Sequence, residues 1–191
     1  MAPKLDVIIC STRPGRVGKP VGDWFDGVAR QHGGFEVELV DLAEVNLPIY
    51  DEPKHPRLQQ YEHEHTRRWS AIVDAADAFV FVTPEYNFGP PPSLVNALNY
   101  VYLEWNYKPA GFVSYGGVSG GMRAVQTEKL TLTTLKMVPI LETVLIPMVP
   151  QHIDKETGAF RPTDIHASSA TAMLDELLRW TNALKPLRQK G

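Results

Sequence analysis

The feature that most constrains the fold is the regular alternation of two kinds of hydrophobic segment along the chain. Short apolar runs rich in β-branched or aromatic residues, such as 5–10 and 78–83, alternate with longer segments whose apolar residues recur at helical spacing. The short runs are typical of buried strands and the longer segments of amphipathic helices. Strands that alternate with helices predict a parallel sheet covered on both faces, and therefore an α/β fold.

Five strands and five helices follow from these patterns. The strands are expected at residues 5–10, 35–41, 78–83, 111–115 and 143–146. The helices are expected at about 21–33, 69–76, 92–104, 121–137 and 170–187. Between the second strand and the second helix, residues 42–62 carry three prolines and predict a long surface loop, a length that is often functional in a compact domain.

Length and composition narrow the class of protein. The 191 residues fit one domain, 1–191, and a net charge of −3 argues against nucleic acid as the main partner. The single cysteine, Cys10, cannot form an internal disulfide or a cysteine-based zinc site. No apolar run approaches the roughly 20 residues of a membrane span, and the first residues lack the apolar core of a signal peptide. We therefore expect a soluble, cytoplasmic protein that binds no membrane.

Three loops are the expected place for chemistry. In open parallel sheets, ligands bind beyond the carboxyl ends of the strands, where the strand order reverses. The loops that follow the first, third and fourth expected strands are residues 11–19, 83–92 and 115–121, which we name the first, second and third loops. All three are rich in glycine, proline or small polar residues.

The first loop has the composition of a phosphate site. It offers hydroxyl groups, Arg13 and Arg16, and backbone amides at the start of the next helix, which together attract an anion. It is neither a Walker loop, because its glycine spacing is too short and Pro20 replaces the Mg²⁺-binding hydroxyl, nor a G-x-G-x-x-G turn. An ordinary solvated turn is the alternative.

The second and third loops suit a flat ring. In the second, Pro84-Glu85-Tyr86-Asn87 combines a rigid turn with an aromatic residue, which favours a heteroaromatic ring that needs stacking and edge hydrogen bonds. The alternative is a β-turn in which Tyr86 simply packs. In the third, repeated glycines allow the backbone to approach a ligand where a Cβ would clash.

These three segments together resemble the NADPH-dependent FMN reductase family, which includes quinone and chromate reductases. Ser11 and Arg13 match its first motif, Pro-Glu-Tyr-Asn stands intact at 84–87, and 114–121 is similar to its glycine-rich third motif. The similarity runs from about residue 4 to residue 149. It implies a flavodoxin-like, doubly wound sheet of five parallel strands in the order 2-1-3-4-5.

The resemblance also implies an activity. Such a protein is an FMN-dependent NAD(P)H oxidoreductase that passes electrons from NADPH or NADH through the flavin to a small acceptor, in alternating half-reactions. The acceptor is a quinone, an azo compound, a metal oxyanion or free flavin. Because the flavin carries the chemistry, no catalytic side chain and no metal are expected. The alternatives are an electron carrier of the flavodoxin type and a flavin-dependent regulatory protein.

Cofactor contacts follow from the same resemblance. The expected FMN-binding residues are Ser11, Arg13, Arg16, Val17 and Gly18 for the phosphate, and Pro84, Glu85, Tyr86, Asn87, Tyr115, Gly116 and Gly117 for the ring. A homodimer or homotetramer is implied, with the helices at 92–104 and 121–136 as contact surfaces.

The remaining histidine, cysteine and aromatic residues that could suggest a functional site are expected to have structural roles instead. His63 and His65 are two positions apart, so on a helix they would face different directions and could not chelate one ion; a solvated helix is expected there. Cys10 is expected in the core rather than as a redox thiol. The aromatic residues Tyr102, Trp105 and Tyr107 are expected to pack a subunit interface.

Overall fold

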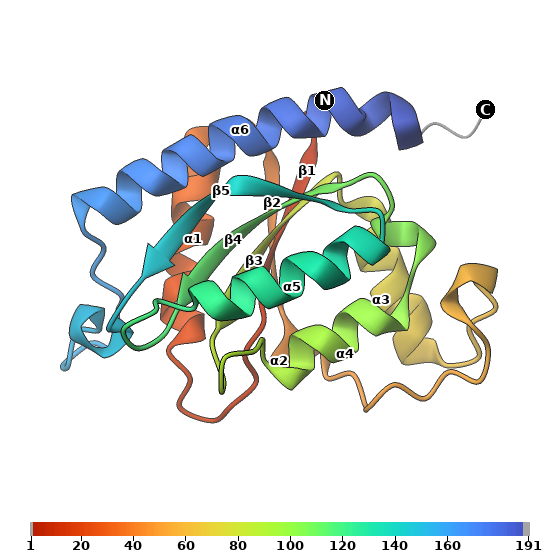
Figure 1. Ribbon diagram of the computed structural model, residues 1–191, viewed down its shortest axis with the longest axis horizontal. Coiled ribbons are helices and arrows are strands. Elements are labelled where there is room, and N and C mark those ends of the chain that lie inside the picture. Colours follow the sequence, from red (N-terminus) through yellow and green to blue (C-terminus); the bar gives the residue numbers. More distant parts are fainter. Residues whose placement is uncertain (1, 189–191) are drawn as a thin grey trace.

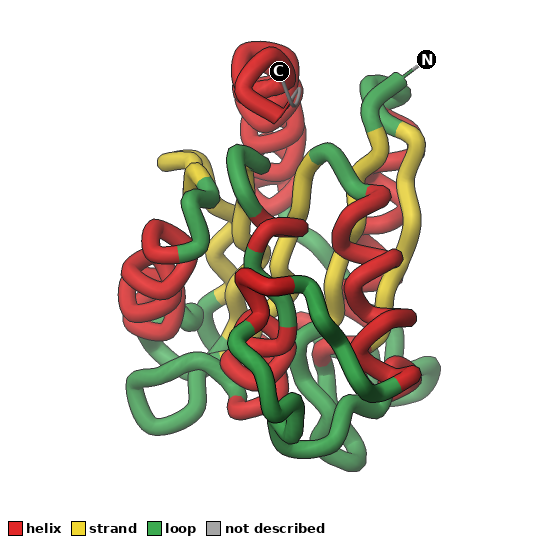
Figure 2. Tube along the Cα trace, turned by 90° about the vertical axis from the view of Figure 1, so that its right-hand side faces the viewer, coloured by secondary structure: helices red, strands yellow, loops and turns green. Residues whose placement is uncertain are grey.

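The computed structural model describes residues 2–188, which form one parallel sheet with helices on both sides (Figures 1 and 2). The strand order β2-β1-β3-β4-β5 and the parallel pairing of every neighbouring pair confirm the prediction. The strands are β1 (Lys4–Ile9), β2 (Glu36–Asp41), β3 (Ala78–Pro84), β4 (Pro109–Tyr115) and β5 (Val138–Ile146).

Within residues 2–188, six α-helices accompany the strands. They are α1 (Gly18–His32), α2 (Leu42–Val45), α3 (Glu64–Ala75), α4 (Pro92–Tyr100), α5 (Met122–Thr134) and α6 (Asp164–Arg188). Three short 3₁₀ turns lie at Pro56–Leu58, Leu103–Trp105 and Val149–His152. None of the helices in the described chain is long and apolar enough to cross a membrane.

The sheet separates two hydrophobic cores, because successive side chains of a strand point to opposite faces. Leu5 and Val7 of β1 pack in the core beneath α1 and α6. Ile8 and Cys10 pack in the core beneath α3, α4 and α5, so the expectation that Cys10 is a core residue is confirmed. All residues of the central strands β3 and β4 are buried, which explains their continuous apolar sequence.

Several predicted boundaries are wrong: α3 begins at Glu64 rather than Trp69, and α4 ends at Tyr100 rather than at 104. β5 begins at Val138 rather than Thr143, because it is an edge strand whose first half leaves Leu141 83% exposed and shows no clean burial pattern. α6 begins at Asp164 rather than Ala170, because its exposed first turn is fixed by polar contacts. The amide of Thr163 donates to His166 Nδ1 at 3.1 Å.

Residues 42–62 are more ordered than a loop. They contain α2 and one 3₁₀ turn, and polar bonds attach them to α4: the amide of Tyr50 donates to Asn96 Oδ1 at 2.9 Å, and the Tyr100 hydroxyl donates to the carbonyl of Pro48 at 3.0 Å. This segment therefore has a fixed position beside α4.

Two interpretations of single residues are also wrong. His63 is the extended N-cap of α3 and not part of the helix, so its ring stacks on that of His65, with centroids 5.1 Å apart, and both rings approach Asp51. Trp105 is not at an interface; it is fully buried against Trp69 and Phe79. For His63 the start of α3 decides the ring's direction, whereas for Trp105 the deciding contacts come from distant parts of the chain.

Candidate flavin site

The first, second and third loops meet at the carboxyl edge of the sheet, toward the lower side of Figure 1. They come together because β1, β3 and β4 are neighbours. Direct hydrogen bonds connect them. The hydroxyl of Tyr115 donates to Ser11 Oγ at 3.0 Å, and the amide of Glu85 donates to the carbonyl of Tyr115 at 3.2 Å. The predicted convergence of the loops is confirmed.

The first loop presents donors and positive charge. Within residues 2–188, the amides of Thr12, Arg13, Gly15 and Val17 donate to no protein acceptor. The exposed Arg13 forms no ion pair within the same range. The loop also leads into the N-terminus of α1, whose first turn has no acidic residue and whose dipole favours an anion. These features fit a phosphate group.

Arg16 is arranged differently from Arg13. Its guanidinium forms an ion pair with Asp41, at the end of β2, and its side chain is only 18% exposed. Asp41 also accepts a hydrogen bond from the amide of Ala43 at 3.0 Å, which caps α2. The charge of Arg16 is therefore compensated by the protein, and its contact with a phosphate stays a prediction.

Gly18 has a packing role within this site. A Cβ at this position would collide with both Ser11 Oγ and the hydroxyl of Tyr115. Burial raises the pKa of Tyr115 well above its usual value, so the phenol stays neutral and remains a hydrogen-bond donor. The absence of a side chain at Gly18 allows this buried contact to form.

The second loop contains a tight two-residue turn. The amides of Tyr86 and Gly89 each donate to the other residue's carbonyl at 2.9 Å, and Asn87 and Phe88 between them have left-handed φ values of 51° and 71°. These are the backbone conformations of a type I′ hairpin turn. Within the described residues, the amides of Asn87 and Phe88 have no acceptor. The predicted turn therefore also offers two donors to a ligand.

Glu85 joins the second loop to the third. Its carboxylate accepts hydrogen bonds from Ser119 Oγ at 2.9 Å and from the amide and Nε of Arg123 at 3.1 and 2.7 Å. Burial alone would raise the pKa of this carboxyl, but these bonds and the charge of Arg123 outweigh it and lower the pKa. The ionised side chain is thus occupied by the protein, which leaves the backbone of Glu85 for a ligand.

Ser119 and Arg123 were missed by the sequence reasoning. Each lies more than 30 residues from Glu85, and no local pattern signals the pairing. Their guanidinium and hydroxyl groups also bind each other, since Arg123 donates to Ser119 Oγ at 3.0 Å.

The third loop is held at its base and open at its tip. The carbonyl of Gly117 accepts from the amides of Gly120 at 3.1 Å and Met148 at 2.8 Å, and the carbonyl of Gly116 accepts from Val149 at 3.0 Å. A Cβ built on Gly117 would meet no atom within 4 Å. No acceptor in the described chain takes the amides of Gly117, Val118 and Ser119. A flat ligand group can therefore approach this backbone closely and accept hydrogen bonds from its amides.

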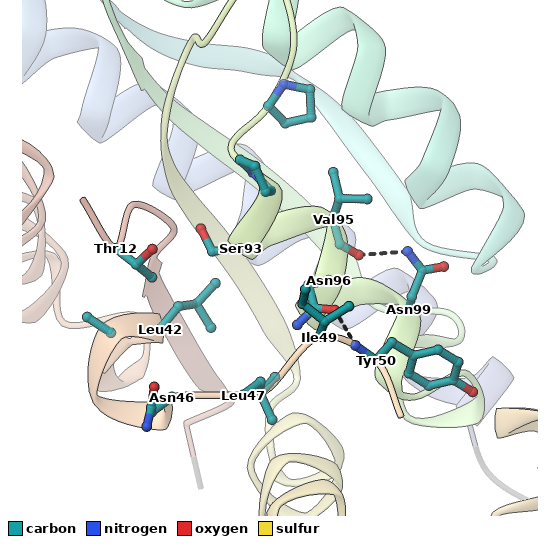
Figure 3. Close-up of a pocket in the computed structure, with 13 residues that line it drawn as sticks. Thr12, Leu42, Asn46, Leu47, Ile49, Tyr50, Ser93, Val95, Asn96 and Asn99 are labelled. Carbon is teal, nitrogen blue, oxygen red and sulfur yellow. Dashed lines mark hydrogen bonds between the residues drawn. The ribbon is translucent and has the colours of Figure 1, made fainter. Parts of the chain in front are cut away.

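A cleft of about 870 Å³ opens beside the first loop (Figure 3). Thr12 of that loop, Ser93 and Asn96 of α4, and Ile49 and Tyr50 of the 42–62 segment face it. The volume lies within the range of small-molecule sites. The segment that the sequence indicated only as a long loop supplies one wall of this cleft.

Comparison with known proteins decides the family. The family model described as "NADPH-dependent FMN reductase" matches residues 3–151. The chain belongs to the NADPH-dependent FMN reductase family. An NAD(P)H-dependent FMN reductase of Schizosaccharomyces pombe is 37% identical over 150 residues, which cover 77% of this chain and 75% of that protein. Another, from Nectria sp., is 35% identical and covers 75% of each chain.

Solved structures support the fold of this family member. FerB of Paracoccus denitrificans, a flavoenzyme NAD(P)H:(acceptor) oxidoreductase, superposes with a TM-score of 0.74 at 21% identity, over 95% of this chain and 98% of that one. A flavodoxin from Streptococcus pneumonia superposes with a TM-score of 0.57 at 12% identity, over 92% and 98%. The predicted flavodoxin-like fold and the predicted family are both confirmed.

Proposed function

We propose that this family member binds FMN at the three loops and transfers electrons from NADPH or NADH to small acceptors. The observation that carries this proposal is the convergence of the three loops with an uncompensated Arg13 and a set of backbone amides that have no acceptor within residues 2–188. An anion and a flat polar ring together satisfy these groups, and FMN contains both.

The first loop would hold the phosphate. Arg13 supplies the charge, and the loop amides and the N-terminus of α1 supply hydrogen-bond donors. The contributing residues proposed here are Ser11, Arg13, Arg16, Val17 and Gly18.

The second and third loops would hold the ring. FMN, when bound, accepts a hydride from the nicotinamide and passes electrons to an acceptor. The amides of Asn87 and Gly117 are fixed by the surrounding hydrogen bonds, so they can stabilise negative charge on a bound ring without rearranging. The contributing residues proposed here are Pro84, Glu85, Tyr86, Asn87, Tyr115, Gly116 and Gly117.

The cleft beside Thr12 and Ile49 would admit the donor and the acceptor in turn. Similar proteins indicate the acceptor classes: a quinone reductase of Pseudomonas putida is 31% identical over 107 residues, and an NADPH azoreductase of Bacillus sp. is 34% identical over 100 residues. We propose quinones and azo compounds as acceptors, with metal oxyanions and free flavin as further members of the range.

We also propose that residues 1–191 act as one domain and assemble as a homodimer or homotetramer in the cytoplasm. Exposed apolar side chains on the expected contact surfaces support the assembly: Val95 on α4, Leu103 just after it and Leu130 on α5. The single cysteine, Cys10, is buried and needs no oxidising compartment. Light scattering on the purified protein measures the oligomeric mass, and a monomer would contradict the assembly.

An anaerobic visible spectrum tests the activity. The purified protein is mixed with FMN, freed of unbound flavin and treated with NADPH or NADH in separate cuvettes. We expect a bound flavin spectrum that bleaches with at least one donor and returns when a quinone is added. Bound FMN that neither donor reduces would favour the carrier or regulatory alternative. Absence of FMN binding would overturn the proposal.

A further inference from the structure

Phe88 occupies a backbone conformation that its side chain does not favour. Its φ of 71° is left-handed, and the type I′ turn between Tyr86 and Gly89 accepts glycine at this position without strain. A bulky residue with such a φ is uncommon and is held there by its surroundings. The conformation of the turn therefore does not explain why phenylalanine stands here.

Burial does not explain Phe88 either. The residue is 64% exposed, so most of its apolar surface remains in water. An exposed aromatic residue in a strained turn next to a ligand-binding loop points to contact with a ligand, because strained residues persist where they serve function.

The orientation of the Phe88 ring is set by a neighbouring cation. The Arg123 guanidinium carbon lies 3.7 Å from the ring centroid, within the range of a cation–π contact. Glu85 and Ser119 hold that guanidinium by hydrogen bonds of 2.7 and 3.0 Å. The turn, the third loop and the start of α5 thus form one connected support beneath an exposed aromatic surface.

We propose that Phe88 is a specificity-determining residue that stacks on flat aromatic acceptors, with Glu85 and Arg123 as positioning residues that orient its ring. This inference rests on the proposed function, because the second loop must lie at the flavin site. It goes beyond that function by assigning the preference for planar acceptors to one side chain outside the Pro84–Asn87 motif.

The test uses the FMN-loaded protein with two variants, Phe88→Leu and Phe88→Gly. A planar naphthoquinone and ferricyanide, which has no flat face, serve as acceptors. Binding of the naphthoquinone to the oxidised protein is also measured without donor, so that no turnover occurs. Lys136→Gly is the matched control, because Lys136 also has a left-handed φ, of 55°, and follows α5, away from the three loops.

We expect both Phe88 variants to weaken naphthoquinone binding and raise its KM about three- to tenfold, the range of one aromatic stack. The KM for ferricyanide, the KM for the nicotinamide and the affinity for FMN should not change. Phe88→Gly should unfold at the same or a higher temperature than the wild type, because glycine relieves the strain. Lys136→Gly should leave both acceptors unaffected.

Three results would overturn the inference while the proposed function stands: unchanged naphthoquinone binding, an equal loss for ferricyanide, or a higher KM for the nicotinamide alone. Failure of the wild-type protein to bind FMN would instead remove the proposed function, and the inference with it.

The positioning role of Arg123 is tested with the variant Arg123→Met. This variant should weaken naphthoquinone binding, yet the double variant Arg123→Met/Phe88→Leu should bind naphthoquinone no more weakly than Phe88→Leu; an additive loss would contradict that role.

Discussion

The hydroxyl of Tyr115, at the end of β4, donates a 3.0 Å hydrogen bond to Oγ of Ser11, just beyond β1. Because β3 lies between these strands, the bond spans the middle of the sheet at its carboxyl edge. Both residues are buried, and the contact leaves no room for a Cβ at Gly18. One side-chain contact thus couples the first and third loops and explains a glycine at the start of α1.

Gly18→Ala should test this coupling. The added methyl group collides with both partners, so we expect the free energy of unfolding to fall by about 1–3 kcal/mol, as for other overpacked sites. Tyr115→Phe removes one of the two colliding atoms. The double variant should therefore lose less than the sum of the single variants, measured by urea unfolding. Strict additivity would show that the two residues are not coupled.

Arg13→Ala should weaken FMN binding with no change in fold. Loss of a charge-assisted hydrogen bond costs about 1.5–3 kcal/mol, which corresponds to a Kd about 10- to 150-fold higher, measured by flavin fluorescence. Arg179→Ala is the control, because Arg179 is an exposed cation on α6. An Arg13 variant that keeps wild-type affinity would refute the phosphate assignment.

Glu128 should make stability depend on pH. Burial raises the pKa of this carboxyl from 4.5 to about 7, and neither oxygen has a hydrogen-bond partner in the described chain. Between pH 4.5 and 7 the folded state keeps the proton that the unfolded state loses. Stability therefore falls as the pH rises through this range.

Glu128→Gln should remove that loss. We expect the variant to be more stable than the wild type at pH 8, by on the order of 3 kcal/mol at most, and equally stable at pH 4. Denaturant unfolding at several pH values measures the difference. The exposed Glu156→Gln should change nothing. A gain for Glu128→Gln that is the same at pH 4 and pH 8 would contradict titration as its cause.

Tyr100→Phe should loosen the segment that forms one wall of the cleft. The Tyr100 hydroxyl shares its one proton between two acceptors, the Pro48 carbonyl and the Asp51 carboxylate, each 3.0 Å away, while its ring is fully buried. Without the hydroxyl, the ring still packs, and about 1 kcal/mol of local stability is lost. Amide hydrogen exchange should become severalfold faster at residues 49–52 and stay unchanged in β3. Equal rates in variant and wild type would mean that other contacts hold the segment.

Elements with a strong local signal were predicted correctly. β3 is a continuous apolar run because helices cover both of its faces, and the Pro-Glu-Tyr-Asn turn follows it directly. The starts of β5 and α6 were predicted wrongly. The first half of β5, with its exposed Leu141, and the polar first turn of α6 lack the hydrophobic periodicity on which such predictions depend.

The candidate site also has parts that sequence predicts and parts that it does not. The three loops were located from sequence, because parallel strands place their carboxyl ends at one edge whatever the details of packing. The side chains that bind Glu85 could not be predicted from sequence. Ser119 and Arg123 reach it only because β4 pairs with β3. The stacking of His63 on His65 was missed because it depends on where α3 begins.

The α/β class, the family and the three loops of the candidate site can be predicted from the amino-acid sequence, since these follow from local periodicity and contiguous motifs. The tertiary structure alone decided which charges are compensated and which stay available. Arg16 is paired with Asp41 while Arg13 is not, and the carboxylate of Glu85 is occupied by Arg123. Such choices depend on distances between residues far apart in the chain, and electrostatic and hydrogen-bond energies are set by those distances.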